Sequence, residues 1–382
     1  MSERLPEIIA LVGSETLLGR EVRDVFGETA LGEQLRLLAS DVAAHDEEPV
    51  RLADVGGTPA ILNPLDPEEL EDAAVVILAG TPESSKLALE NNPTGVIIDL
   101  TGAAEEDPQA RVRAPQVEGG DYRADHDGPQ IAAHPAALAI ALVLCRLNPA
   151  FPIARSIVHI FEPASERGKS GIDELQKQTV SLLSFQQIPK DVFAAQLGFN
   201  MLAKLGEEAK VQLHDVEDRI DRHLATLLER ADTGVPMPSI RLTQAPVFHG
   251  YSLSFWIEFE DAPDVMSLEG VLSGDWIDVR SAELEPPDNA GIAGQSGISV
   301  GAITPDRNDG NAVWLWLAAD NLRLTAETAA LIARETLLSS SQSFPWPARF
   351  CFPPAAIRSA ERPACCPKTS TPSPSHHSPT PA

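Results

Sequence analysis

The hydrophobic positions of this chain repeat in two different ways, one on each side of a single apolar helix. In the first part, mainly apolar runs alternate with stretches of helical period. The runs are EIIALVG, LRLLA, AAVVILA and GVIIDL, at Glu7–Gly13, Leu35–Ala39, Ala73–Ala79 and Gly95–Leu100. Strands buried on both faces read as continuous apolar runs, and strands that alternate with helices form parallel sheets. We therefore predict a doubly wound α/β sheet whose ligands bind at the carboxyl ends of its strands.

From Arg155 onward the strands alternate between apolar and polar positions, beginning with SIVHIFEP. Further strand-like runs and helical stretches follow, at Ser239–Pro246, Phe248–Glu258, Trp276–Val279, Ile298–Ile303 and Val313–Ala319 for strands and Glu207–Leu228 for a long helix. Strands grouped in this way predict an α+β domain with a mainly antiparallel sheet. The expected plan is a first domain over 1–130, completed by a closing helix at 320–338, a second domain over 131–319, and a disordered tail rich in Pro and Ser over 339–382.

The helix between the two patterns belongs to Ile131–Cys145, which reads as a strand end, a tight turn at His134 and Pro135, and a buried apolar helix. Pro135 suits the first helical position, where its missing N–H costs nothing. A helix N-terminus stabilises a thiolate or binds an anion. The residues that follow, Ala136 and Ala137, carry neither a thiol nor a hydroxyl. The elbow resembles a site for covalent chemistry that lacks its nucleophile.

The first strand runs into a glycine-containing turn, in which Gly13 and Gly19 bracket SETLL. A strand, a Gly-rich turn and a helix receive the pyrophosphate of a dinucleotide in Rossmann-type folds. The middle glycine of that motif is Thr16 here, and Ser40 ends the next strand, where a ribose or its phosphate would bind. The alternative is a plain strand-to-helix turn, and Thr16 makes weak or absent NADP binding the expectation.

Composition narrows the class of protein further. The formal net charge of −27 argues against a nucleic-acid partner. The longest apolar run, 136–147, is too short to span a bilayer and contains Arg146. No segment with basic and then apolar residues, as in a signal peptide, precedes the first strand. We therefore expect a cytoplasmic protein with no membrane partner. Cys145 reads as a core residue. The other cysteines, Cys351, Cys365 and Cys366, fit no metal-finger spacing, and no metal is predicted.

Taken in order, several short segments make the chain similar to the aspartate-semialdehyde dehydrogenase family over roughly Glu7 to Leu338. These segments are ALVGSETLLGRE, LRLLAS, GKSGIDELQKQT, GFNMLAKLGEEAK, PVFHGYS, SVGAI and AADNLR. The resemblance implies a two-domain dehydrogenase that reduces an acyl phosphate to an aldehyde with NADPH, through a thioester on a cysteine at the start of a helix. It also implies a dimer formed by the second domain.

The resemblance places Ala136 at the nucleophilic cysteine. It places Glu162 at the glutamine that assists the cysteine, Gln244 at the substrate-binding arginine and Tyr251 at the acid–base histidine. His249 lies two residues before Tyr251, which in a strand keeps both on one face, so His249 is the fallback acid–base residue.

The same resemblance puts Glu105 at the phosphate-binding arginine, which reverses the charge that an acyl phosphate requires. It puts Glu118 at a nearby asparagine. Other positions near the cofactor match the family, namely Ser165, Gly168, Gly171 and Asn321. The sequence thus predicts a retained scaffold with an altered site.

Three hypotheses follow. The first is a non-catalytic paralogue that keeps the two-domain fold and the homodimer. The second is an active NAD(P)-dependent semialdehyde dehydrogenase with a rearranged site, in which Tyr251 and His249 are the acid–base candidates. The third is a regulatory or interaction protein that uses the family's dimer surface to pair with itself or, as a heteromer, with an active homologue.

Overall fold

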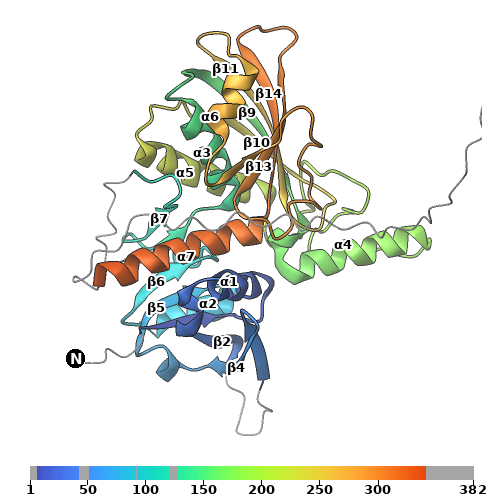
Figure 1. Cartoon of the computed structure of the whole chain (residues 1–382). Helices are drawn as coiled ribbons and strands as arrows, with labels where there is room; N and C mark the ends of the chain where they lie inside the picture. The colour runs from blue at the N-terminus through green and yellow to red at the C-terminus, as the bar shows by residue number, and fades with distance from the viewer. Residues whose placement is uncertain (1–6, 43–50, 92, 120–127, 341–382) are drawn as a thin grey trace, which may run out of the picture. The chain divides into compact units, whose positions relative to one another are not determined.

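The computed structural model describes residues 7–42, 51–91, 93–119 and 128–340, and their helices and strands are drawn in Figure 1. These elements form two sheets, which we call sheet A and sheet B. The predicted combination of a parallel sheet with a mainly antiparallel one is confirmed. The predicted Pro- and Ser-rich tail, with its three cysteines, lies outside the described residues apart from its first two positions.

Sheet A has eight strands in the order β3-β4-β2-β1-β5-β6-β8-β7. They are β3 (Arg51–Val55), β4 (Thr58–Leu65), β2 (Leu35–Val42), β1 (Ile8–Val12), β5 (Ala73–Leu78), β6 (Val96–Asp99), β8 (Gln130–Ala132) and β7 (Arg111–Arg113). All neighbours are parallel except β3 and β4. That antiparallel pair was not predicted, although Gly56 and Gly57, both at positive φ, are typical of a two-residue hairpin turn.

Helices cover both faces of sheet A. On one face, apolar strand residues pack with α1 (Leu17–Gly27) and with a stripe of alanines on α7 (Asn321–Ser340). The other face packs with α2 (Pro82–Glu90). Two short 3₁₀ turns connect elements of this sheet, at Ala30–Gln34 and Pro67–Glu69. Helix α7 contacts α1, so the last described helix of the chain packs against the first sheet (Figure 1).

Sheet B has six strands in the order β10-β9-β11-β14-β13-β12. They are β10 (Ser239–Gln244), β9 (Ile153–Glu162), β11 (Tyr251–Phe259), β14 (Ala312–Ala319), β13 (Ile298–Pro305) and β12 (Ile277–Val279). The outermost pairs are parallel and the three inner pairs are antiparallel. One face of sheet B packs with α3 (Pro135–Leu147), α5 (Leu213–Ala231) and α6 (Val265–Leu272) in a single apolar cluster (Figure 1). Helix α4 (Gly168–Leu183) follows a 3₁₀ turn at Ala164–Arg167.

Two predicted elements begin later than expected. The helix expected at Glu207 begins at Leu213, because Gly206 packs closely against the Ala194 carbonyl and the Gln212 side chain donates to backbone carbonyls of the preceding turn. The strand expected at Phe248 begins at Tyr251, because Gly250 has a φ of +79° that no strand residue adopts. Among the described residues, no helix is both long enough and apolar enough to span a bilayer.

Candidate active site

The predicted elbow forms between β8 and α3. His134 caps α3: its Nδ1 accepts a hydrogen bond from the Ala136 N–H at 3.2 Å, and Pro135 occupies the first turn of the helix, as predicted. The His134 N–H donates to Nδ1 of His223, on α5, at 2.9 Å. Burial holds the pKa of the His134 imidazole well below its usual value, and Ala136 itself is fully buried. The elbow is therefore a packed turn with a neutral histidine at its cap.

Sheet B brings three of the positions named from the sequence to this elbow. Gln244 lies opposite Glu162 in the β10–β9 pair, and its Nε2 donates to the Glu162 carbonyl at 2.8 Å. The ring of Tyr251, at the start of β11, packs edge-on against the His134 ring with 5.9 Å between centroids. Tyr251 and Ala136 belong to one buried apolar cluster. Burial raises the pKa of the Tyr251 hydroxyl well above its usual value, and the charges of Glu166 and Glu162 raise it further.

Glu162 is a fully buried carboxylate that forms an ion pair with Arg167. Arg167, from the turn before α4, approaches both of its oxygens at 3.1 and 3.2 Å. Burial raises the pKa of Glu162 to about 7, although the Arg167 charge opposes the shift. This side chain therefore changes its protonation state near neutral pH.

Glu105 forms a second ion-paired group close to the elbow. Its loop is held by the Asp99 carboxylate, which accepts the N–H groups of three loop residues, Thr101, Gly102 and Ala104. Arg219 Nε donates to Glu105 Oε1 at 2.5 Å, and His223 Nε2 lies 3.3 Å from the same oxygen. Burial opposes ionisation of Glu105, but the hydrogen bonds and charges of His223 and Arg219 lower its pKa to about 2.

Arg219 joins the two groups electrostatically, because its charge lowers the pKa of His134 and acts on both Tyr251 and Glu166. The α5 residues that approach Glu105, namely Arg219, Arg222 and His223, were not singled out from the sequence. Their spacing of three and four residues places them on one face of a helix, and this spacing is the signal that could have found them. We call Ala136, Glu162, Tyr251, Glu105 and Arg219, with their hydrogen-bond and ion-pair partners, the elbow site.

Two residues named from the sequence have other surroundings. His249 lies in the turn before β11, so the strand alternation that was to align it with Tyr251 does not apply, because Gly250 reverses the backbone between them. Its carbonyl accepts a hydrogen bond from Asn289. Glu118 bonds the buried Arg113 guanidinium at 2.8 Å, which ties β7 to the segment that follows it.

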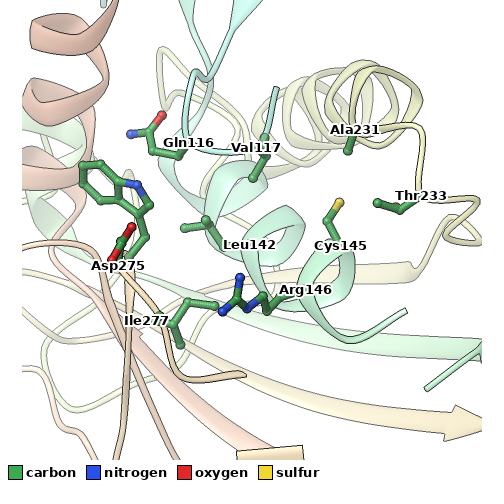
Figure 2. A pocket seen from close by; sticks show the side chains of 11 residues that line it. Gln116, Val117, Leu142, Cys145, Arg146, Ala231, Thr233, Asp275 and Ile277 are labelled. Atoms are coloured by element: carbon green, nitrogen blue, oxygen red, sulfur yellow. The ribbon is translucent and has the colours of Figure 1, made fainter. Parts of the chain in front are cut away.

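Cys145 lies in a different place from the elbow site. It lines a pocket of about 360 Å³ together with side chains from α3, from the C-terminal end of α5 and from the segment before β12 (Figure 2). Figure 2 shows its thiol beside Thr233, and no residue of the elbow site lines this pocket. Burial raises the pKa of the Cys145 thiol, which keeps it protonated and unreactive at neutral pH.

The glycine turn after β1 lies where the strand order of sheet A reverses, between β1 and β5. A Cβ on Gly13 would lie 2.1 Å from the Gly80 Cα, so these two turns touch through backbone alone. Thr16 caps α1: its hydroxyl accepts from the Gly19 N–H at 2.9 Å and donates to the Ala79 carbonyl at 2.8 Å. The Thr16 side chain is therefore directed into the turn by two hydrogen bonds.

Two matched cofactor positions bond each other. Ser165 Oγ donates to Asn321 Oδ1 at 3.1 Å, and Asn321 Nδ2 donates to Glu166 at 2.9 Å. Gly168 begins α4 with a φ of +61°. These bonds link α7 to the turn before α4 beside the elbow site.

Known proteins are similar to this chain in sequence. Residues 144–324 match the family model of the semialdehyde dehydrogenase dimerisation domain. An aspartate-semialdehyde dehydrogenase from Prochlorococcus marinus is 26% identical over 345 residues, which cover 88% of this chain and 97% of that protein. The chain is thus similar to the semialdehyde dehydrogenases over most of its length. A protein named USG-1 protein homolog, from Pseudomonas aeruginosa, is 27% identical over 349 residues.

Solved structures of the family share the fold. A probable aspartate-semialdehyde dehydrogenase from Pseudomonas aeruginosa aligns with a TM-score of 0.73 at 23% identity, covering 88% of this chain and 99% of its own. The aspartate-semialdehyde dehydrogenase of Candida albicans, solved with NADP, aligns with a TM-score of 0.56 at 13% identity. NADP use is thus represented among the semialdehyde dehydrogenases that this chain resembles.

Proposed function

We propose that this chain is a non-catalytic paralogue of the aspartate-semialdehyde dehydrogenases. The observation that carries the proposal is the start of α3, where Pro135, Ala136 and Ala137 are all buried and none has a nucleophilic atom. A thioester requires a thiolate at the helix start. Cys145 is no substitute, because it lies nine residues along α3, about 13 Å at 1.5 Å per residue, and opens into another pocket.

The cations of the elbow site support the same proposal. An acyl phosphate needs cations that are available to its oxygens. Here Arg219 bonds Glu105 beside His223, and Arg167 bonds Glu162, so each of these arginines already has a carboxylate of this chain as a partner. An anionic substrate would have to displace these internal carboxylates.

A turnover assay tests the proposal directly. Purified full-length protein is mixed with aspartate semialdehyde, inorganic phosphate and NADP or NAD, and reduced cofactor is measured by absorbance. We expect no rate above that of the buffer, and mass spectrometry after acid quench should find no acyl adduct. A phosphate-dependent rate that disappears in Cys145→Ala or His249→Ala would overturn the proposal.

One observation favours a second candidate, an active dehydrogenase without a covalent intermediate. The pKa of Glu162, raised by burial to about 7, matches the requirement of a general base that works near neutral pH. This candidate predicts oxidation of small aldehydes or alcohols with NAD or NADP that is lost in Glu162→Gln. Glu33→Gln, which removes one negative charge from the exposed part of a distant turn, is the control and should retain the rate.

We further propose that the chain is a homodimer formed through the face of sheet B that is opposite its core. Trp256 lies between Ile157 and Trp314 in register across β9, β11 and β14, and Ile157 and Trp314 are each 42% exposed. Trp316 contacts Phe161 on the same face, with 5.8 Å between ring centroids. Aromatic residues gathered on one face are typical of interface cores, and the matched family model is a dimerisation domain.

Light scattering coupled to gel filtration tests the dimer, because the chain mass is 40.9 kDa and a dimer doubles it. The double variant Ile157→Asp, Trp314→Asp should weaken self-association at least a hundredfold, because it places two charges at the centre of the face. Met266→Asp, on α6, is the control. A monomeric wild-type chain would contradict the homodimer and would direct attention to a heteromer with an active homologue.

A further inference from the structure

Glu15 lies in the glycine turn between β1 and α1, but its carboxylate reaches the end of the neighbouring strand β2. Its Oε1 accepts a hydrogen bond from the Ser40 N–H at 2.8 Å. Ser40 is at the carboxyl end of β2, which pairs in parallel with β1. In a doubly wound sheet, the end of the second strand is where the ribose next to the adenine of a dinucleotide is bound. The Glu15 carboxylate, a hydrogen-bond acceptor, therefore lies beside the position where the ribose of a dinucleotide is bound.

Two oxygen atoms at this point are buried and lack a partner within the described residues, namely Glu15 Oε2 and Ser40 Oγ. Burying a carboxylate oxygen without a donor costs free energy, so a ligand that supplies donors here gains by satisfying it. An ionised carboxylate only accepts hydrogen bonds. The matching ligand group is a hydroxyl, and a ribose with free 2′ and 3′ hydroxyls presents two.

A 2′-phosphate has the opposite chemistry, because it is itself an acceptor with negative charge. Placed against Glu15 it would meet like charge without a donor between them. We propose that Glu15 determines cofactor specificity, so that this chain binds dinucleotides with a free 2′ hydroxyl, of the NAD(H) class, and discriminates against NADP(H). The inference departs from the cofactor expected by resemblance. It requires only that the site binds a dinucleotide, whether or not the elbow site turns over.

One cation lies close enough to compete with this effect. Arg20 Nε donates to the Glu15 backbone carbonyl at 3.0 Å, and the Arg20 side chain is exposed. A guanidinium next to the ribose is the usual device for accepting a 2′-phosphate. The discrimination thus depends on whether the Glu15 carboxylate, with its buried oxygen, outweighs the exposed charge of Arg20. Screening by solvent weakens an exposed charge more than a buried one.

The experiment is equilibrium binding by titration calorimetry of the full chain with NAD⁺ and with NADP⁺. Wild type should bind NAD⁺ at least tenfold more tightly than NADP⁺. Glu15→Gln, which keeps the shape and removes the charge, should reduce that ratio about tenfold, mainly by tightening NADP⁺. Glu33→Gln removes the same charge from an exposed 3₁₀ turn and should leave the ratio unchanged.

Three results would overturn the inference: equal or tighter binding of NADP⁺ by wild type, a ratio that Glu15→Gln does not move, or no binding of either nucleotide at millimolar concentration. Arg20→Gln separates the two side chains, because a preference for NADP⁺ that depended on Arg20 would disappear in it. Circular dichroism of each variant confirms folding, and Glu15→Ser provides a second neutral replacement. Since binding is measured without turnover, a negative result here is distinct from the absence of catalysis.

Discussion

Two strand-to-helix elbows in this protein use the same backbone design for different purposes. The glycine elbow joins β1 to α1 and is made of backbone, with Gly13 against Gly80 and Thr16 as the cap. The His-Pro elbow joins β8 to α3 and is capped by His134. Both present a helix N-terminus at the carboxyl end of a sheet A strand, where anions and dinucleotides bind. Only the second needs a particular side chain to react.

This difference indicates which kind of site keeps its function when the sequence changes. A backbone site is specified by the fold, so its geometry persists as long as the glycines at its close contacts persist. A nucleophile is specified by one side chain, and under the proposed function Ala136 takes its position without disturbing the helix, since alanine is the best helix former. The ion pair of Glu105 with Arg219 then stabilises the protein rather than a substrate, and Arg167 pairs with the buried Glu162.

The largest effect is expected at the glycine elbow, from Gly13→Ala. The new Cβ would lie 2.1 Å from the Gly80 Cα, and the φ of +80° is unfavourable for alanine. We expect the free energy of unfolding to fall by about 4 kcal/mol or more, the sum of overpacking and a left-handed alanine. Urea unfolding followed by circular dichroism measures the loss.

Gly57→Ala is the matched control for this substitution. Gly57 has a φ of +86°, but nothing lies within 4 Å of an added Cβ. It should cost only about 1–2 kcal/mol, which is the conformational part alone. Equal losses in the two variants would show that the contact with Gly80 contributes nothing and would weaken the comparison of the two elbows.

The next effect is the pH dependence of stability that Glu162 causes. Its pKa is raised by burial from 4.5 to about 7, so the folded state binds a proton more tightly than the unfolded state. Stability from this group is therefore full below pH 4.5 and is lost as pH rises through 7, by about 3 kcal/mol at about 1.4 kcal/mol per pKa unit. Glu162→Gln lacks this titration. Relative to wild type it should gain about that amount between pH 4.5 and 8 in urea unfolding, and parallel pH profiles would refute the shift.

Glu105 should behave in the opposite sense. His223 and Arg219 outweigh the effect of burial and lower its pKa from 4.5 to about 2, so its stabilisation is present above pH 4.5 and is lost as pH falls towards 2. At pH 7, Glu105→Gln should cost about 2 kcal/mol, somewhat less than the full shift because the side chain is partly solvated. The neighbouring exposed Glu106 supplies the control: Glu106→Gln should change stability by less than about 0.5 kcal/mol. A cost at pH 7 no larger than that of the control would argue against the paired arrangement.

Much of the fold could be predicted from the sequence because its signals are local. Continuous apolar runs identified β1, β2, β5 and β6, and Pro135 marked the start of α3. The β3–β4 hairpin was missed because its strands are largely exposed and carry no continuous apolar run, and only Gly56 and Gly57 marked its turn.

The elbow site was only partly predictable, because its members come from distant parts of the chain. The resemblance named Ala136, Glu162, Tyr251 and Glu105, but it gave no reason to consider Arg219, which reaches Glu105 from a helix 114 residues later. A pairing of that kind depends on how α5 packs against the elbow, and local patterns carry no information about it. Likewise, Glu15 is an ordinary turn residue until β2 brings Ser40 beside it.

The smallest structural effect, and the sharpest test of the comparison, is expected from Ala136→Cys. The position is fully buried at the first turn of α3, so one added sulfur atom should lower the free energy of unfolding by about 1 kcal/mol, the low end of the cost of overpacking. The thiol gains the field of the helix N-terminus, which lowers its pKa, but the carboxylates of Glu162 and Glu105 oppose the thiolate. Tyr251, whose pKa is raised by burial, supplies no acid–base group near neutral pH. We therefore expect the variant to remain without phosphate-dependent oxidation of aspartate semialdehyde. If the single substitution restored turnover, inactivity would rest on the missing sulfur alone, and the charges at this elbow would have to be compatible with catalysis after all.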